Sequence, residues 1–124
     1  MLNKSAKTGR RGFTLVEIMI VVTIIGVLLA VAIPNFVKAR NSSRGKACVG
    51  NLKMIDSAKE QYMLDTRSTT APGAMSNLVT DYIKSTPVCP STGTYTLGDA
   101  TTAPTCSIGT NGTSDTTDDH VLTQ

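Results

Sequence analysis

The chain has 124 residues, a length typical of one small domain, and only 4% of them are aromatic. Its formal charge of +3 comes from one end, because Lys4, Lys7, Arg10 and Arg11 precede every acidic residue. Without these four, eight basic residues (12 minus 4) face nine acidic ones, a formal charge of −1. This distribution argues against nucleic-acid binding as the main function and indicates a basic leader on the cytoplasmic side of a membrane.

An uncharged apolar run follows the basic leader. Residues 18–36 read IMIVVTIIGVLLAVAIPNF, and a helix of this length spans roughly 29 Å, close to the hydrocarbon thickness of a bilayer. A chain this short could not enclose a helix that is apolar on every side. Two membrane interpretations stay open. One is a signal peptide cut after Ala32, which releases a small soluble binding domain, and the other is a helix kept in the membrane after cleavage at Gly12.

Glu17 favours the retained helix. A carboxylate in an apolar run costs about 2.5–3.5 kcal/mol on insertion scales, and it gives an ordinary signal peptide no benefit. In a helix that assembles within the membrane, a cation on a neighbouring subunit offsets this cost and fixes the axial register. The alternative is a Glu17 side chain that reaches the headgroups without a specific partner.

The segment RGFTLVEIMIVVTIIGVLLAVAIPNF resembles the N-terminus of type IV pilins and of the pseudopilins of type II secretion. The resemblance implies that a prepilin peptidase cuts after Gly12 and N-methylates the new N-terminus, Phe13. It also implies that Glu17 is the acidic position of the family, and the charged amine of Phe13 in a neighbouring subunit is then its expected partner. Gly26 and Pro34 stand where such subunits weaken the helix, which allows local melting when the subunit enters a filament.

The resemblance implies a structural subunit of a type IV pilus or a type II secretion pseudopilus, not an enzyme. Its expected partners are the prepilin peptidase and methylase, other copies of itself, related subunits and the membrane. Its expected location is the inner membrane, with one span, a cytoplasmic leader and an outer C-terminal domain, and then the filament. Pilus and pseudopilus, and major and minor subunit, stay open, although the short C-terminal domain slightly favours a pseudopilin.

We expect an α+β fold with four parts. They are a leader (1–12), a hydrophobic helix (13–36), its amphipathic continuation (37–65) and a small C-terminal domain (66–124). The continuation carries one apolar stripe at helical spacing, which predicts a docking face for the C-terminal domain. The stripe consists of Cys48, Leu52, Ile55, Ala58 and Tyr62.

The C-terminal domain is expected to contain one short helix and one β-hairpin. SNLVTDYIK, residues 76–84, predicts the helix, with Ser76 as its N-cap. GTYTLG and TCSI predict the two strands, joined by DATTAP.

Three cysteines, Cys48, Cys89 and Cys106, match no common zinc-binding spacing. In an exported domain they predict one disulfide and one free thiol. A Cys89–Cys106 bond would flank the hairpin, close an eighteen-residue loop and stabilise the domain by roughly 3 kcal/mol. Cys48 could instead pair with either, but we predict Cys89–Cys106.

The polar C-terminal tail offers little chemistry. Its histidine, His120, is the only one in the chain, so it supports no catalytic Ser/His/Asp set, and we expect a surface residue. Asp115, Asp118 and Asp119 are weak calcium candidates, because some related pseudopilins bind calcium in their C-terminal loops. Their spacing matches no EF-hand, so we expect a solvated acidic loop, no cofactor and no metal.

Overall fold

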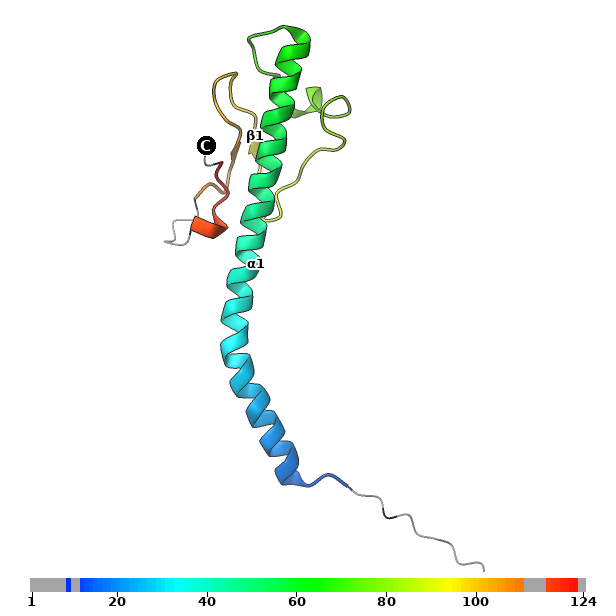
Figure 1. Cartoon of the computed structure of the whole chain (residues 1–124), viewed down its shortest axis with the longest axis vertical. Helices are drawn as coiled ribbons and strands as arrows, with labels where there is room; N and C mark the ends of the chain where they lie inside the picture. Colours follow the sequence, from blue (N-terminus) through cyan, green and yellow to red (C-terminus); the bar gives the residue numbers. More distant parts are fainter. Residues whose placement is uncertain (1–8, 10–11, 111–115, 123–124) are drawn as a thin grey trace, which may run out of the picture. The chain divides into compact units, whose positions relative to one another are not determined.

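The structure is a computed structural model that describes residue 9, residues 12–110 and residues 116–122. It contains one long helix, two short 3₁₀ helices and one pair of strands (Figure 1). In chain order these are α1 (Leu15–Thr66), η1 (Met75–Asn77), β1 (Tyr95–Thr96), β2 (Thr105–Cys106) and η2 (Thr116–Asp118). The expected α+β fold, a long N-terminal helix followed by a small domain with a short helical element and a hairpin, is confirmed.

The α1 helix is continuous over 52 residues and contains Pro34. A proline has no N–H group, so the carbonyl of Ala30 loses its usual helical donor at this position. The surrounding residues are mostly Leu, Ile, Val and Ala, and their backbone bonds hold the helix on both sides of the proline. The chain divides into two compact units, residues 1–36 and residues 37–124.

A complete hydrogen-bonded motif ends α1. The N–H of Ser68 donates to the carbonyl of Met63 at 3.1 Å, and the N–H of Arg67 donates to that of Leu64 at 3.3 Å. Arg67 has φ of 50°, the left-handed conformation that this Schellman motif requires after a helix. Thr66 Oγ1 also donates to the Tyr62 carbonyl at 2.6 Å, and α1 ends at Thr66, one residue beyond the expected helical continuation 37–65.

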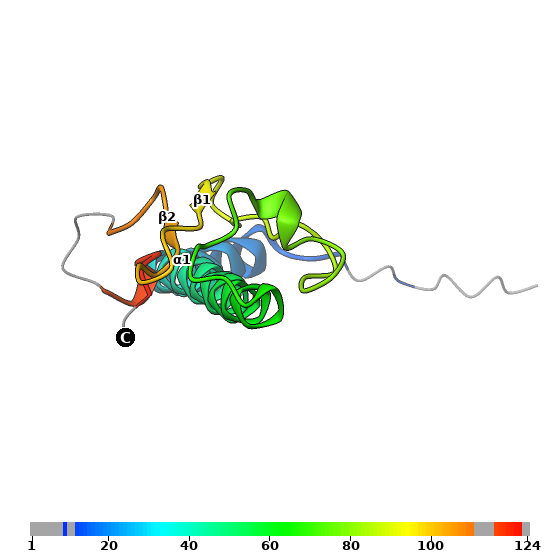
Figure 2. The ribbon, with the colours of Figure 1, turned by 90° about the horizontal axis from the view of Figure 1, so that it is seen from above.

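In the second unit, the segments after α1 pack against its C-terminal half. Seen from above, η1 and the two strands lie on one side of α1 (Figure 2). The helix contributes the expected stripe: Cys48, Leu52 and Ile55 are fully buried, and Ala58 is 3% exposed. The prediction of a docking face is therefore confirmed.

The stripe divides between two hydrophobic clusters. The first cluster consists of Cys48, Leu52, Cys89 and Cys106, with Tyr95, Ile108 and Leu122 packed around it. The second cluster consists of Ile55, Ala58, Leu78 and Ile83, with Tyr62, Met75, Tyr82, Tyr95 and Leu97 packed around it. Tyr95 contacts both clusters from β1, so the hairpin joins the two halves of this thin core.

The hairpin is antiparallel, with Tyr95 opposite Cys106 and Thr96 opposite Thr105. The two threonine hydroxyls lie 3.0 Å apart on its exposed face. The register turns the Cys106 side chain towards α1, where it is 6% exposed. The expected β-hairpin therefore also places one of the three cysteines in the core.

Lys59 is buried on α1, which the apolar stripe did not predict. Its side chain is 2% exposed, and its ammonium lies 3.2 Å from the carboxylate of Asp56. The ammonium also donates to the carbonyls of Thr102 at 2.7 Å and Asp99 at 3.3 Å. Buried charges persist when they are paired and hydrogen-bonded, so Lys59 ties the loop between β1 and β2 to α1.

The segment 76–84 is not the short α-helix that its sequence predicts. The 3₁₀ helix η1 begins after Ala74, which forms no side-chain cap, so Ser76 lies inside η1 and is not its N-cap. The backbone then turns at Thr80, whose φ is 86°, and an isolated bridge pairs Val79 with Ile83. A left-handed threonine breaks the helical path, while the burial of Leu78 and Ile83 fixes this turn.

Candidate functional site

The expected cleavage site is accessible in this structure. Gly12 and Phe13 precede α1, and the Phe13 side chain is 86% exposed. No described atom would lie within 4 Å of a Cβ built on Gly12. Both sides of the Gly12–Phe13 bond are therefore open to a protease.

Thr14 and Glu17 form a reciprocal cap at the start of α1. Glu17 Oε2 accepts hydrogen bonds from the Thr14 backbone N–H at 2.8 Å and from the Thr14 hydroxyl at 3.0 Å. In return, the Glu17 N–H donates to Thr14 Oγ1 at 3.2 Å. This is a capping box, the motif T-x-x-E at a helix N-terminus, which satisfies N–H groups that would otherwise lack partners.

The capping box was missed from the sequence, although the signal was present. Thr14 stands three residues before Glu17 and just before the apolar run. In residues 12–110, all hydrogen bonds to the carboxylate go to Oε2. The carboxylate is therefore part of the helix start within one chain, and its second oxygen points to no described donor.

The first half of α1 presents apolar side chains on all its sides. From Leu15 to Phe36, the exposed fractions of the large apolar side chains range from 48% at Ile25 to 75% at Leu15. By length and composition, α1 can cross a membrane. A helix that is apolar all round is stable only when lipid or other protein covers it.

Gly26 and Pro34 both lie inside this exposed part of α1. No described atom would lie within 4 Å of a Cβ built on Gly26, so the glycine is not required by packing within the chain. Glycine and proline weaken a helix by different means: the first by backbone entropy, the second by a missing donor. Their proposed role in melting stays a prediction.

Comparisons with known proteins match this segment. Residues 7–33 match the family described as the prokaryotic N-terminal methylation motif. The chain is 36% identical over 81 residues to the competence protein ComGC of Bacillus subtilis, covering 64% of this chain and 81% of ComGC. The chain belongs to the family of type IV pilins and pseudopilins.

Other relatives of this pilin-family chain include a type IV pilin and a type II secretion protein. It is 50% identical over 52 residues to the type IV major pilin protein PilA of Myxococcus xanthus, covering 42% of this chain and 24% of PilA. It is 32% identical over 75 residues to the type II secretion system core protein G of Klebsiella michiganensis, covering 60% of this chain and 53% of that protein. No solved structure matches the chain.

The chain thus spans about a quarter of its pilin relative and about half of its secretion relative. These relatives are structural proteins and not enzymes, which confirms that the chain is a structural protein.

The C-terminal part of this pilin-family protein brings the three cysteines together. Cys48, Cys89 and Cys106 are all buried and all free, and the Sγ atoms of Cys89 and Cys106 lie 3.8 Å apart. A disulfide bond is about 2.05 Å long. The predicted Cys89–Cys106 disulfide is therefore not formed here, and it stays a prediction for the oxidised protein.

His120 is not the surface residue that its polar surroundings predict. Its side chain is 4% exposed, and its Nδ1 lies 3.4 Å from the Sγ of Cys89. The backbone N–H of His120 donates to the carbonyl of Gly109 at 2.9 Å, which fixes the tail beside the hairpin. Sequence reasoning missed this contact because the cysteines and the histidine lie far apart in the chain and form no local motif.

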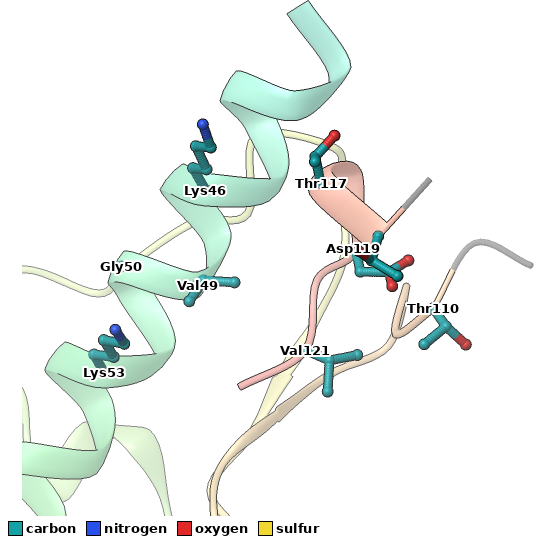
Figure 3. Close-up of a pocket in the computed structure, with 9 residues that line it drawn as sticks. Lys46, Val49, Gly50, Lys53, Thr110, Thr117, Asp119 and Val121 are labelled. Atoms are coloured by element: carbon teal, nitrogen blue, oxygen red, sulfur yellow. The ribbon is translucent and has the colours of Figure 1, made fainter. Parts of the chain in front are cut away.

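The acidic tail is only partly described, because Asp115 lies outside the described residues. Asp118 Oδ1 is buried and has no hydrogen-bond partner among the residues that the structure describes. Asp119 lines a hollow of about 620 Å³ between α1 and the tail, together with Lys46 and Lys53 (Figure 3). Two lysines beside this hollow reduce its negative charge, and calcium binding by Asp118 and Asp119 stays a prediction.

Proposed function

We propose that this protein is a structural subunit of a pilin-like filament, assembled through the first half of α1. The observation that carries the proposal is the exposure of every large apolar side chain from Leu15 to Phe36. At about 25 cal/mol per Å², leaving such a helix in water is strongly unfavourable. Lipid covers it before assembly in our proposal, and the helices of neighbouring subunits cover it afterwards.

Processing precedes assembly in this proposal. A prepilin peptidase removes residues 1–12 on the cytoplasmic side and methylates the amine of Phe13. The four basic residues of this leader favour the cytoplasmic side, which gives a single span with residues 37–124 on the outer side. The match of residues 7–33 to the N-terminal methylation motif supports this order of events.

Glu17 serves two roles in this proposal. Through Oε2 it caps α1, and both Thr14 bonds can persist after cleavage because Thr14 stays in the mature chain. Its charge then attracts the Phe13 amine of the neighbouring subunit, since an unpaired carboxylate at this depth is costly. Pairing of opposite charges in an apolar setting also penalises subunits that dock out of register.

The small size of the C-terminal part favours a pseudopilus over a pilus. After Thr66, the described part of the chain forms only two strands of two residues each and two 3₁₀ turns. Such a domain presents little surface around a filament. Deletion of the protein should then reduce protein secretion and leave long surface fibres intact, whereas loss of the fibres would assign it to a pilus.

Fractionation of cells that produce the chain with a C-terminal tag tests the proposal of a filament subunit. The chain should appear in the membrane and in a high-molecular-weight filament fraction. A Gly12→Leu variant, with a large residue at the cleavage site, is the matched control and should remain in the membrane alone. Recovery of the unaltered chain mainly as a soluble monomer outside the cell would overturn the proposal and favour release after Ala32.

A further inference from the structure

Four potential metal ligands meet in the core of residues 37–124. The Sγ atoms of Cys48, Cys89 and Cys106 and a ring nitrogen of His120 all lie within 4.8 Å of one another. All four residues are buried, with exposed fractions of 0%, 3%, 6% and 4%. They come from α1, the loop before β1, the end of β2 and the tail, so they meet only when the domain is folded.

Two of the six distances between these ligand atoms are close to those around a tetrahedral zinc ion. With zinc–sulfur bonds of about 2.3 Å and a zinc–nitrogen bond of about 2.0–2.1 Å, tetrahedral angles separate two sulfurs by about 3.8 Å, and a sulfur from a nitrogen by about 3.6 Å. Here the Sγ atoms of Cys89 and Cys106 are 3.8 Å apart. The Sγ of Cys89 and the Nδ1 of His120 are 3.4 Å apart.

The backbone around Cys89 and Cys106 holds both sulfurs towards one point. Each cysteine starts a tight turn, because its carbonyl accepts from the N–H three residues later, of Thr92 at 3.1 Å and of Gly109 at 3.0 Å. A Cβ on Gly93 would lie 2.6 Å from the Sγ of Cys106 and 3.2 Å from that of Cys89. Position 93 therefore needs a glycine for the two sulfurs to approach.

Hydrogen bonds position two of the cysteine sulfurs. The sulfur of Cys89 accepts from the backbone N–H groups of Ser91 and Gly93. The Tyr95 hydroxyl donates to the sulfur of Cys48. Donors of this kind orient and tune the ligands of metal sites.

A disulfide explains this cluster less well than a metal ion. A Cys89–Cys106 bond would use two of the four side chains and would not explain why the Cys48 sulfur and a ring nitrogen of His120 lie within 4.8 Å of both of them. A divalent cation instead binds all three thiolates, offsets two of their three negative charges and takes the histidine nitrogen as its fourth ligand. Three thiolates and one imidazole in a tetrahedral arrangement select zinc, and four protein ligands leave no open position for substrate.

We propose that Cys48, Cys89, Cys106 and His120 bind one Zn²⁺ ion, which joins the hairpin and the C-terminal tail to α1. The site is structural. Deprotonated thiols are the ligands, so binding releases protons to the solvent and involves no change of oxidation state.

The full-length chain in detergent tests this assignment. It is purified from membranes without reductant and without added metal, and its zinc content and free thiols are measured. We expect one zinc per chain and three thiols that react only after a chelator is added. A Cys89–Cys106 disulfide in protein without zinc would overturn the proposal.

Cobalt identifies the ligands. Replacement of zinc by Co²⁺ should give the absorption of a tetrahedral site together with sulfur-to-cobalt charge transfer. Loss of a residue that only bonds to a ligand weakens metal binding by about 10–100-fold, and we expect an effect of this size for Tyr95→Phe. Loss of a ligand should weaken zinc binding by more than this in each of the variants Cys48→Ser, Cys106→Ser and His120→Gln.

Ile83→Ala is the control for loss of stability without loss of a ligand. Ile83 belongs to the second hydrophobic cluster, so this variant should lower the melting temperature and keep one zinc. Wild-type zinc affinity in Cys48→Ser or His120→Gln would overturn the four-ligand site. Equal loss of zinc in Ile83→Ala and the ligand variants would overturn it too, since folding alone would then explain the result.

Discussion

The Thr14 hydroxyl donates a hydrogen bond to Oε2 of Glu17 at the start of α1, with the two oxygens 3.0 Å apart. The backbone N–H of Glu17 donates to the same hydroxyl in return. This contact lies next to the expected cleavage site, one residue after Phe13. Glu17 thus has a structural role within a single chain as well as the role in assembly that we propose. The two roles can be separated by substitution.

Glu17→Gln should reduce incorporation into filaments about tenfold, the factor that about 1.4 kcal/mol of lost pairing gives. Glutamine still serves in a capping box, so the helix start is kept and only the charge is removed. Quantitative immunoblots of the filament fraction against total membrane-inserted protein measure the effect. Glu17→Val should behave as badly while inserting at least as well, and Glu17→Asp should keep part of the function.

Thr14→Val is the matched control, because it removes two of the three capping bonds and leaves the charge of Glu17. It should assemble far better than Glu17→Gln. Equal losses in Thr14→Val and Glu17→Gln would mean that Glu17 acts through the cap. Wild-type assembly of Glu17→Gln would mean that the carboxylate has no partner in the filament.

Lys59→Met should destabilise residues 37–124 by about 1–3 kcal/mol, because the carbonyls of Asp99 and Thr102 lose their buried donor. Thermal unfolding of the full-length chain in detergent, followed by circular dichroism, measures this change. Lys53→Met is the control: it places the same side chain on the same helix, at an exposed position. Equal melting temperatures for the two variants would contradict a role for Lys59 in holding the hairpin loop.

Gly45→Ala and Gly50→Ala should have opposite effects on the same helix. A Cβ at Gly45 would lie 2.8 Å from the carbonyl carbon of Asp118, so the tail must move, at a cost of about 1–3 kcal/mol. A Cβ at Gly50 meets no described atom within 4 Å, and alanine should stabilise the helix by about 0.5–1 kcal/mol. Unfolding in urea measures both. A neutral Gly45→Ala would show that the tail does not pack against α1.

Local patterns predicted the elements of this fold that depend on few distant contacts. The 3.6-residue period identified the stripe from Cys48 to Ala58, and two short runs of strand-forming residues identified the hairpin. The helix predicted for residues 76–84 was wrong, because the turn at Thr80 is set by the burial of Leu78 and Ile83 against α1. Tertiary packing overrides propensity in such short segments.

The same distinction applies to the candidate sites. Gly12, Phe13 and Glu17 stand within six residues of one another, so the sequence could indicate them together. The cysteine and histidine cluster draws on positions from 48 to 120, and its spacing matches no metal motif. Lys59 was missed for a similar reason, since its partners Asp99 and Thr102 lie about 40 positions along the chain and approach it only in the folded domain.

Mass spectrometry of the mature N-terminus, on protein taken from the membrane and filament fractions, tests the proposed function most directly. We expect a chain that begins at Phe13, with a methylated amine, and no residues of the 1–12 leader. The Gly12→Leu variant should keep that leader. An unaltered chain that begins at Ile33, or that keeps its leader in assembled material, would show that the proposed processing is wrong.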